Sequence, residues 1–295
     1  MYLLCDIGGS KTRVGATKDC RLLVGEPIVF ENTNDVTKDM ARFAEAAREA
    51  AGGETVEGLA GGIAGVLDAE HARLVFSPNK PADVWVGAPI RDLLSKAING
   101  APVHLENDTA MIGLGEAHFG AGRGAGIIAY MTVSTGIGGS RIVDGAIDAA
   151  RFGFEPGRQI IDLDGSACPL CGSDAERPLG ELEAYASGGG LKRRFGKSPY
   201  LVEEEHVWDE VAYWLAVGLN NTIVLWSPDV IVLGGSMING TKGPVISLEA
   251  IEKHLKKVNR AFPELPILKK AELGDFGGLY GAMAYINQKH LSSRA

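Results

Sequence analysis

Two stretches of the 295-residue chain share one pattern of apolar and polar positions. Residues 3–17, LLCDIGGSKTRVGAT, begin with an apolar run, continue through a glycine-rich turn and end in a second extended run. Residues 127–143, IIAYMTVSTGIGGSRIV, repeat this order. Each stretch predicts a strand, a tight turn and a returning strand. Because each hairpin opens one half of the chain, we infer a duplicated α/β unit.

The rest of the pattern predicts further helices and strands. Helices are expected over residues 35–51, 89–98, 109–119, 204–226, 244–258 and 277–290. Extended runs predict strands over residues 21–31, 56–67, 103–105, 230–233 and 267–273. The first helix should stop at the glycine pair Gly52 and Gly53. The fold class that follows is α/β.

Composition limits the class of protein. With 45% hydrophobic and 22% charged residues, the chain is typical globular material and long enough for two lobes with cores of their own. Its net charge of −8 argues against a nucleic-acid partner, because an acidic surface repels the phosphate backbone. The first residues lack the basic segment and long apolar run of a signal peptide or membrane span. We therefore expect a cytoplasmic protein.

The residues in the two turns favour phosphate binding. Glycines let backbone N–H groups approach a phosphate closely, hydroxyl groups donate to it, and lysine supplies positive charge. The first turn offers Gly8, Gly9, Ser10, Lys11 and Thr12, and the second offers Ser134, Thr135, Gly136, Gly138, Gly139 and Ser140. Neither turn has the spacing of a Walker loop or leads into a helix. Taken alone, the first could be a plain glycine hairpin; as a pair, the turns imply a nucleotide between the two halves.

Carboxylates follow two of the predicted strands. Asp6 comes at the end of the first strand, where it could hold Mg²⁺ through water. Asn107 and Asp108 follow the strand over residues 103–105 and precede a predicted helix. Side chains at the carboxyl ends of strands project into the ligand crevice of open α/β sheets. Asp108 is thus either a plain helix cap or a base that deprotonates an acceptor hydroxyl during phosphoryl transfer.

The four cysteines suit a reducing compartment as free thiols. Cys5 and Cys20 fall in strand-like stretches. Cys168 and Cys171 form a C-x-x-C, which could be half of a zinc site, but a structural site needs four ligands and no histidine lies nearby in the sequence. Loop thiols without metal are the simpler interpretation.

Six motifs give the chain a resemblance to a known family. They are DIGGSKTRVG (residues 6–15), LENDTAMIGLGE (105–116), TVSTGIGGS (132–140), FEPG (154–157), LEAYASG (182–188) and VIVLGGS (230–236). Their order resembles that of the ROK family of sugar kinases and sugar-responsive repressors, over residues 3 to about 285. The resemblance implies an α/β, duplicated actin-like (ribonuclease H-like) two-lobed ATPase fold, with nucleotide and sugar in the interlobe cleft. Residues 1–110 would form the N-terminal lobe, with a helix at about 280–295 packed back on it, and residues 111–280 the C-terminal lobe.

The resemblance also implies roles for individual residues. ATP and Mg²⁺ would be the cofactors, Asp6 would lie close to the metal, and Asp108 would be the catalytic base. The cofactor-binding positions would be Gly8, Gly9, Ser10, Lys11, Thr12, Thr135, Gly136, Gly138, Gly234, Gly235 and Ser236. The sugar-binding positions would be Asn79, Asn107, Asp108, Glu155 and Glu183. Carboxylates and amides suit a polyol, because each can bond to adjacent hydroxyls.

The chain departs from the family pattern at one loop. Arg158 stands where the family's E-x-G-H has a histidine that contacts sugar and binds structural zinc, and only Cys168 and Cys171 remain of the family's three zinc cysteines. We therefore expect no family-type zinc site. A guanidinium stays protonated and cannot replace the zinc ligand. As a substrate-binding position, Arg158 could instead donate to a sugar hydroxyl or to an anionic group, which leaves the identity of the substrate open. Our hypothesis is that it pairs with Asp162 or Asp164 and stiffens the loop without metal.

The resemblance thus implies an ATP-dependent hexose kinase of the glucokinase type. We expect glucose, phosphorylated at its 6-hydroxyl, as the substrate, with fructose, mannose or an N-acetylhexosamine as alternatives. A sugar-sensing regulator or a degenerate, non-catalytic sugar binder are the alternatives from another class. Because the phosphate hairpin begins within the first residues, we expect no DNA-binding segment of the kind that a regulator needs. A homodimer is the family-based expectation, with no membrane or nucleic-acid partner.

Overall fold

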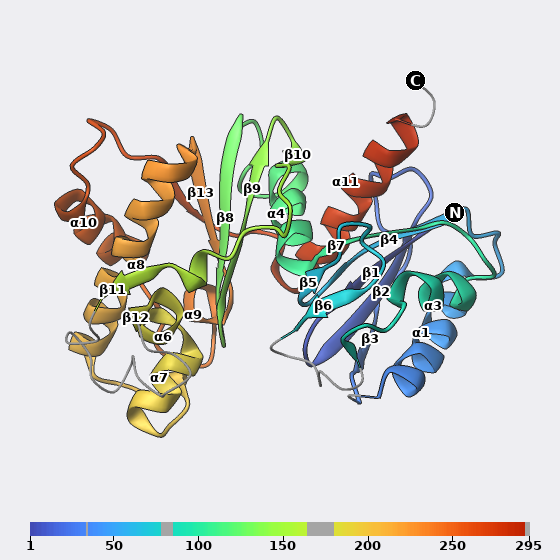
Figure 1. Ribbon diagram of the computed structural model, residues 1–295, viewed down its shortest axis with the longest axis horizontal. Helices are drawn as coiled ribbons and strands as arrows, with labels where there is room; N and C mark the ends of the chain where they lie inside the picture. The colour runs from blue at the N-terminus through green and yellow to red at the C-terminus, as the bar shows by residue number, and fades with distance from the viewer. Residues whose placement is uncertain (34, 78–84, 164–179, 293–295) are drawn as a thin grey trace. The chain divides into compact units, whose positions relative to one another are not determined.

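The computed structural model describes residues 1–33, 35–77, 85–163 and 180–292 (Figure 1). The chain divides into two compact units. Unit 1 consists of Met1–Phe119, Ala149–Gly153 and Leu273–Ala295, and unit 2 consists of Gly120–Asp148 and Phe154–Glu272. Each unit has a five-stranded sheet and its own hydrophobic core.

The sheet of unit 1 has the strand order β3-β2-β1-β4-β7. Its strands are β1 (Tyr2–Ile7), β2 (Lys11–Thr17), β3 (Ile28–Glu31), β4 (Gly58–Ile63) and β7 (Val103–Asn107). Neighbours β1, β2 and β3 pair antiparallel, whereas β1, β4 and β7 are parallel. A small second sheet joins β5 (Val66–Leu67) to β6 (Leu74–Phe76). The helical elements are α1 (Val36–Ala51), α3 (Ile90–Ala97), α4 (Asp108–Phe119), η3 (Gly274–Phe276) and α11 (Gly277–Ser292).

Helices cover both faces of this sheet. Side chains alternate between the two faces of a strand, so Leu3, Cys5 and Ile7 of β1 enter the core that α1 and α3 complete. Leu4 points the other way and packs with Leu279 of α11. Burial on both faces explains why β1 is a continuous apolar run. Figure 1 shows α11, the last helix of the chain, in the same unit as the first strand.

The sheet of unit 2 has the order β10-β9-β8-β13-β14. Its strands are β8 (Ile127–Val133), β9 (Ile137–Val143), β10 (Ala146–Ile147), β13 (Val230–Gly234) and β14 (Ile267–Lys270). The other described elements are η1 (Pro156–Arg158), β11 (Ile160–Asp162), β12 (Gly180–Glu181), α6 (Leu182–Ala186), α7 (Gly188–Phe195), η2 (Pro199–Leu201), α8 (Glu205–Trp226), α9 (Ser236–Asn239) and α10 (Leu248–Val258). As in unit 1, an antiparallel hairpin is followed by parallel strands. The two hairpins and the α/β class were predicted and are confirmed.

Several predicted elements are shorter than the sequence suggested. The strand expected over residues 21–31 is reduced to β3, because Gly25 has a φ of +68° and Pro27 follows it. The strand expected over 56–67 is two strands, β4 and β5, separated at Gly65, where φ is +127°. Helix α10 starts at Leu248 instead of residue 244, because Ser247 caps it by accepting from Ala250 N–H.

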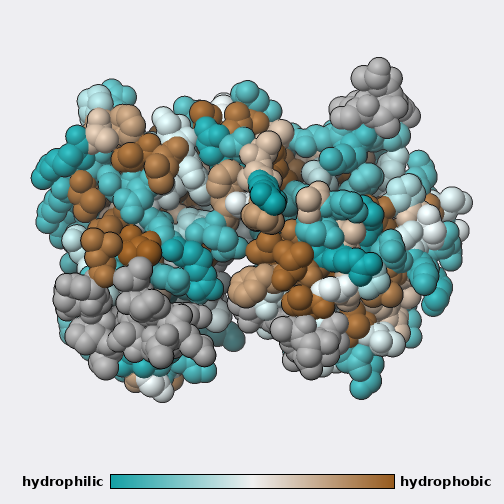
Figure 2. Space-filling view, viewed as in Figure 1, coloured by the Kyte–Doolittle hydropathy of each residue, from teal (hydrophilic) through white to brown (hydrophobic). Residues whose placement is uncertain are grey.

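Hydrophilic and hydrophobic residues are interspersed on the face shown in Figure 2. Some apolar side chains are strongly exposed, such as Leu163 and Leu225. Among the helices that the structure describes, none combines the length and the apolar character that a membrane crossing requires.

Candidate active site

The first turn, between β1 and β2, is held by a residue outside the hairpin. Gly8 N–H donates to Lys11 O across the turn at 3.0 Å. Asn32 lies beside the turn, and its amide group donates to Gly8 O at 2.8 Å. The hydroxyl of Thr12 donates to Asn32 Oδ1 at 2.7 Å. Asn32 therefore fixes the shape of the turn, a role that its position in the sequence did not indicate.

The turn residues differ in what they can offer a ligand. Ser10 and Lys11 are exposed, and Gly8 and Gly9 are half-buried. Thr12 is buried, with 2% of its surface exposed, and its hydroxyl proton is already given to Asn32. The geometry thus does not support the expectation that Thr12 donates to a phosphate. Its hydroxyl instead holds Asn32 beside the turn.

Asp6, at the end of β1, is a buried carboxylate. Arg13 Nη1 donates to its Oδ2 at 3.1 Å, and Gly278 of α11 packs against its carboxyl group. Burial raises the pKa of Asp6 to about 7, the charges of Asp108 and Asp275 contribute to the increase, and Arg13 opposes it. Mg²⁺ prefers oxygen ligands and keeps several waters, so the carboxylate of Asp6 has the donor chemistry to hold the ion through water. Among the described residues, no three acidic, histidine or cysteine side chains are placed to hold a metal directly.

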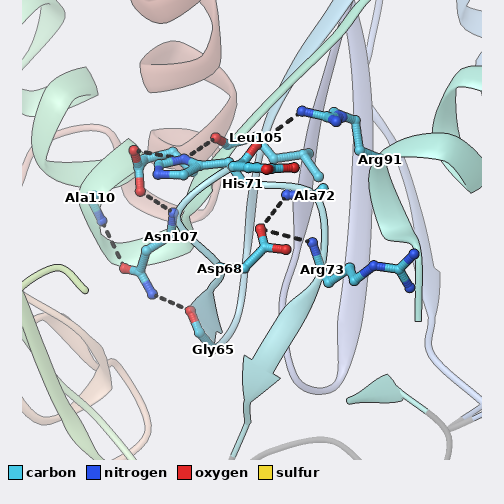
Figure 3. A network of polar contacts seen from close by, with 11 residues as sticks. Gly65, Asp68, His71, Ala72, Arg73, Arg91, Leu105, Asn107 and Ala110 are labelled. Atoms are coloured by element: carbon cyan, nitrogen blue, oxygen red, sulfur yellow. Dashed lines mark hydrogen bonds and ion pairs between the residues drawn. The ribbon is translucent and has the colours of Figure 1, made fainter. Parts of the chain in front are cut away.

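Figure 3 shows the polar network at the carboxyl end of β7, where the chain enters α4. Asn107 donates through its amide group to Gly65 O at 3.0 Å. Its Oδ1 accepts from the N–H groups of Thr109 and Ala110 at 2.9 and 3.1 Å, so Asn107 caps α4. Most of the hydrogen-bonding capacity of this side chain is therefore used to fix the corner. The sequence placed Asn107 against the sugar and did not reveal this second role.

A histidine and a glutamate support the same corner (Figure 3). Glu106 Oε1 accepts from Asn107 N–H at 2.9 Å. His71 Nδ1 lies 3.4 Å from Glu106 Oε2 and 2.9 Å from Leu105 O. Because β7 is an edge strand, the Leu105 carbonyl has no neighbouring strand to bond. The imidazole of His71 is its hydrogen-bond partner instead.

Asp108 is the first residue of α4 and is half-buried. A Cβ on Gly62 of β4 would lie 2.8 Å from the Asp108 Cα, so the close approach of β4 to Asp108 requires a glycine at position 62. Asp108 Oδ1 accepts from Thr109 N–H at 2.9 Å. The backbone of the expected base is thus fixed from two sides, by Gly62 and by the Asn107 cap.

The second turn, between β8 and β9, is held by α6 and α7. Gly188 and Gly189, at the start of α7, donate to Ser134 O and Thr135 O at 2.7 and 2.9 Å. A cavity of about 480 Å³ opens beside the turn. Its walls include Thr135, Gly189, Lys192, Tyr200, Ser236 and Lys242. Thr135 and Ser236 were predicted nucleotide positions, whereas the two lysines and the tyrosine lie in stretches without a recognisable motif.

The other predicted glycines of unit 2 act through the backbone. Gly138 is part of β9, where it pairs with Thr132. A Cβ on Gly234 would come within 2.7 Å of the Tyr130 hydroxyl, and one on Gly235 within 2.3 Å of Val133 O. Gly235 also has a φ of +89°, which favours glycine. These residues allow β13 to turn sharply toward Ser236 and the cavity.

Arg158 forms ion pairs, but with other partners than expected. Its Nη1 donates to Glu181 Oε2 at 2.9 Å, and its Nη2 lies 3.5 Å from Glu183 Oε1. Asp162 instead accepts from the Tyr185 hydroxyl at 2.6 Å. The hypothesis paired Arg158 with Asp162 or Asp164. The Asp162 alternative was wrong, because the antiparallel pairing of β11 with β12 brings Glu181 to the guanidinium, and Asp164 lies outside the described residues.

The remaining predicted residues are placed as follows. Glu155 is exposed and precedes η1. Glu183, in the first turn of α6, accepts from Ile137 N–H at 2.9 Å. Asn79, Asp164, Cys168 and Cys171 lie outside the described residues. Cys5 and Cys20 are buried free thiols, and burial raises the pKa of both.

Comparison with known proteins places this geometry in a family. The model of the ROK family matches residues 2–289. The chain is 28% identical to a glucokinase from Thermotoga maritima, with 96% of each chain covered. It is also 28% identical to an N-acetyl-D-glucosamine kinase from Vibrio atlanticus, with 98% of this chain and 100% of the relative covered.

Two solved structures extend the comparison. The ROK hexokinase from Thermus thermophilus superposes with a TM-score of 0.79 at 30% identity, with 98% of this chain and 99% of that chain covered. A ROK family glucokinase from Streptomyces griseus, in complex with glucose and AMPPNP, has a TM-score of 0.76 at 25% identity, with coverages of 97% and 99%. These matches confirm the actin-like ATPase fold expected from the motifs. The chain belongs to the ROK family.

Proposed function

We propose that the protein is an ATP-dependent sugar kinase that transfers the γ-phosphate to a hexose, with glucose and its 6-hydroxyl as the expected acceptor. The observation that carries the proposal is the β7–α4 corner, where a half-buried Asp108 is fixed on Gly62 beside the Asn107 cap. The glucokinase name of the relative from Thermotoga maritima and the glucose and AMPPNP bound by the Streptomyces griseus enzyme support the same function.

The proposed chemistry assigns a task to each part of the site. Asp108 orients the acceptor hydroxyl and removes its proton as the oxygen attacks the γ-phosphate. Ser10, Lys11, Thr135 and Ser236 are the positions proposed to bind the nucleotide. Mg²⁺, held near Asp6 through water, would neutralise phosphate charge. Positioning of this kind supplies most of the catalysis in phosphoryl transfer.

The lobes of the kinase would correspond to the two units. We propose that unit 1 corresponds to the lobe predicted over residues 1–110 together with the closing helix, and unit 2 to the lobe predicted over 111–280. The units place residues 111–119, 149–153 and 273–280 in unit 1 instead. A cytoplasmic homodimer stays a prediction, and light scattering on the purified protein would test the dimer.

The identity of the sugar is the finer part of the proposal. One relative is named a glucokinase and another an N-acetyl-D-glucosamine kinase, at equal identity. An N-acetylhexosamine is therefore one alternative to glucose. Fructose and mannose stay the alternatives expected from the family resemblance. Arg158, a residue that differs from the family pattern, also keeps a non-catalytic sugar binder as a second candidate.

The test is ADP release with ATP and Mg²⁺ over a panel of hexoses, N-acetylhexosamines and a blank without sugar. Replacing the base by Asp108→Asn should lower kcat by about 10²- to 10⁴-fold. Asp92→Asn, the same substitution at an exposed position of α3, serves as the control and should leave kcat unchanged. Sugar binding without turnover, in the wild-type protein, would favour the non-catalytic alternative. Turnover that survives Asp108→Asn would remove Asp108 from the role of base.

A further inference from the structure

The hairpin of β5 and β6 is attached to the β7–α4 corner at two points (Figure 3). Just before the hairpin, Gly65 O accepts from the Asn107 amide group at 3.0 Å. At its tip, His71 Nδ1 lies 2.9 Å from Leu105 O and 3.4 Å from Glu106 Oε2. Because a carbonyl oxygen only accepts, Nδ1 carries a proton and donates it. The hairpin thus holds three consecutive residues of β7, directly before the expected base.

The backbone of His71 has a conformation that is uncommon for a residue other than glycine. Its φ is +52°, in the left-handed region. His71 N–H donates to Asp68 O at 2.9 Å, and Asp68 Oδ1 accepts from the N–H groups of Ala72 and Arg73 at 2.7 and 3.3 Å. Asp68 therefore fixes the turn on both sides of His71. Residues held in such conformations by their surroundings cluster at functional sites.

Glu106 connects His71 to the helix that carries the expected base. Its Oε2 faces His71, and its Oε1 accepts from Asn107 N–H at 2.9 Å, so both oxygens have a partner. The side chains of His71 and Glu106 are 37% and 18% exposed, which partly shields their contact from water. Asn107 in turn caps α4 through its Oδ1. A displacement of His71 would therefore also displace the first turn of α4, where Asp108 lies.

We propose that His71 and Glu106 are positioning residues for the expected base. The Nδ1 donor of His71 and the carboxylate of Glu106 hold the β7–α4 corner in the geometry that proton removal by Asp108 requires. The proposal rests on the proposed function, because it takes Asp108 as the base. It keeps Asn107 and Asp108 among the expected sugar ligands and adds two residues that act through them. His71 belongs to none of the six motifs in the sequence.

The experiment separates the donor of His71 from its backbone conformation. His71→Asn keeps an N–H group at the position of Nδ1 and tolerates a positive φ, whereas His71→Gly keeps only the conformation. ADP release is measured with the sugar that gives the fastest turnover. His71→Gly should lower kcat by about tenfold, because small misplacements of a reacting group are costly, and should leave KM for ATP unchanged. His71→Asn should restore most of kcat, and equal kcat values in the two variants would overturn the proposal.

Two further variants separate positioning from a general loss of stability. Asn99→Gly removes an exposed side chain at another positive φ, +59°, before the opposite end of β7, and should leave kcat unchanged. Glu106→Gln removes the charge that faces His71 and should lower kcat as His71→Gly does, which tests the pair even if the glycine variant does not fold. Calorimetry with AMPPNP and Mg²⁺ counts the binding-competent molecules, so that kcat is compared per competent molecule. A wild-type kcat in Glu106→Gln would contradict the role of the pair.

Hydrogen exchange separates this proposal from the proposed function. The amides of Asn107, Thr109 and Ala110 are bonded within the network and should exchange faster in His71→Gly than in the wild type, whether or not the protein is a kinase. His71→Asn should restore their protection. Unchanged exchange in His71→Gly would reject the positioning role outright. A wild-type protein without sugar turnover would overturn the proposed function, and the exchange data would still decide whether His71 holds the corner.

Discussion

At the scale of the residue, two hydroxyl side chains in one turn have different roles. Ser10 is exposed at the tip of the β1–β2 turn, whereas Thr12 is buried and bonded to Asn32. The sequence shows only that both follow closely after the glycine pair Gly8 and Gly9. What separates them is that Thr12 lies within β2, where Asn32 accepts its hydroxyl proton, whereas Ser10 lies in the turn before β2 begins.

Thr12→Val tests this difference. The substitution keeps the shape but leaves Asn32 Oδ1 without its donor, which should destabilise the protein by about 1–3 kcal/mol. Ser10→Ala should leave the unfolding temperature unchanged and raise KM for ATP. Thermal unfolding and steady-state kinetics of both variants provide the test. A stable Thr12→Val protein with a raised KM for ATP would instead return Thr12 to the phosphate site.

His104, on β7, makes stability depend on pH. Burial lowers its pKa, and the charges of Lys289 and Arg91 lower it further. Because the folded-state pKa lies below that of the unfolded chain, the unfolded state binds the proton first. The stability that the neutral imidazole contributes is thus present above about pH 6.5 and is lost as the pH falls through the folded-state pKa.

His104→Gln should therefore reduce the loss of stability on acidification. The difference in unfolding temperature between about pH 7.5 and about pH 5.5 should be smaller in this variant than in the wild type. His206→Gln removes an exposed imidazole from α8 and is the matched control. An equal pH dependence in His104→Gln and the wild type would show that His104 does not contribute.

At the scale of the element, α4 and α11 approach so closely that their contact needs glycine. A Cβ on Gly115 of α4 would lie 2.5 Å from Gly277 O, and one on Gly281 of α11 would lie 1.7 Å from Met111 O. Backbone atoms on both sides of the contact cannot move aside as a side chain can. Since α4 carries Asp108 at its first residue, this contact also fixes the helix of the expected base.

Gly281→Ala should force the two helices apart. We expect a loss of at least about 3 kcal/mol in the free energy of unfolding, because overpacking against backbone finds no room to relax. Asn287→Ala adds no atoms at an exposed position of the same helix and serves as the control. Chemical denaturation of both variants is the measurement, and a Gly281→Ala protein of wild-type stability would contradict the packing described for α4 and α11.

The sequence predicted the helices and strands more accurately than the contacts between residues that are distant in the chain. Both hairpins and helix α1 with its Gly52 stop were predicted, since turn glycines and apolar spacing are local signals. The strand over residues 21–31 was overestimated because Leu22 and Val24 are apolar yet 70% and 40% exposed. The partners of Arg158 and the role of Asn32 depend on residues distant in sequence, and no local pattern encodes which acidic or amide side chain arrives there.

At the scale of the whole molecule, unit 2 interrupts unit 1 in the sequence. Unit 1 begins with residues 1–119 and is completed by residues 273–295, and most of what lies between belongs to unit 2. The helix that completes unit 1 is α11, which covers Leu4 and Ala60 on one face of the first sheet. The apolar face of that sheet thus depends on a segment from the other end of the chain.

This order has a consequence for biosynthesis. A ribosome adds about 5–20 residues per second, so α11 follows the first 119 residues by on the order of ten seconds. During that interval unit 2 can fold, while the face of the N-terminal sheet at Leu4 and Ala60 still lacks the cover of α11. We therefore expect unit 2 to complete its fold before unit 1, against the usual N-terminal-first order, and the apolar surface around Leu4 to be completed last on the growing chain.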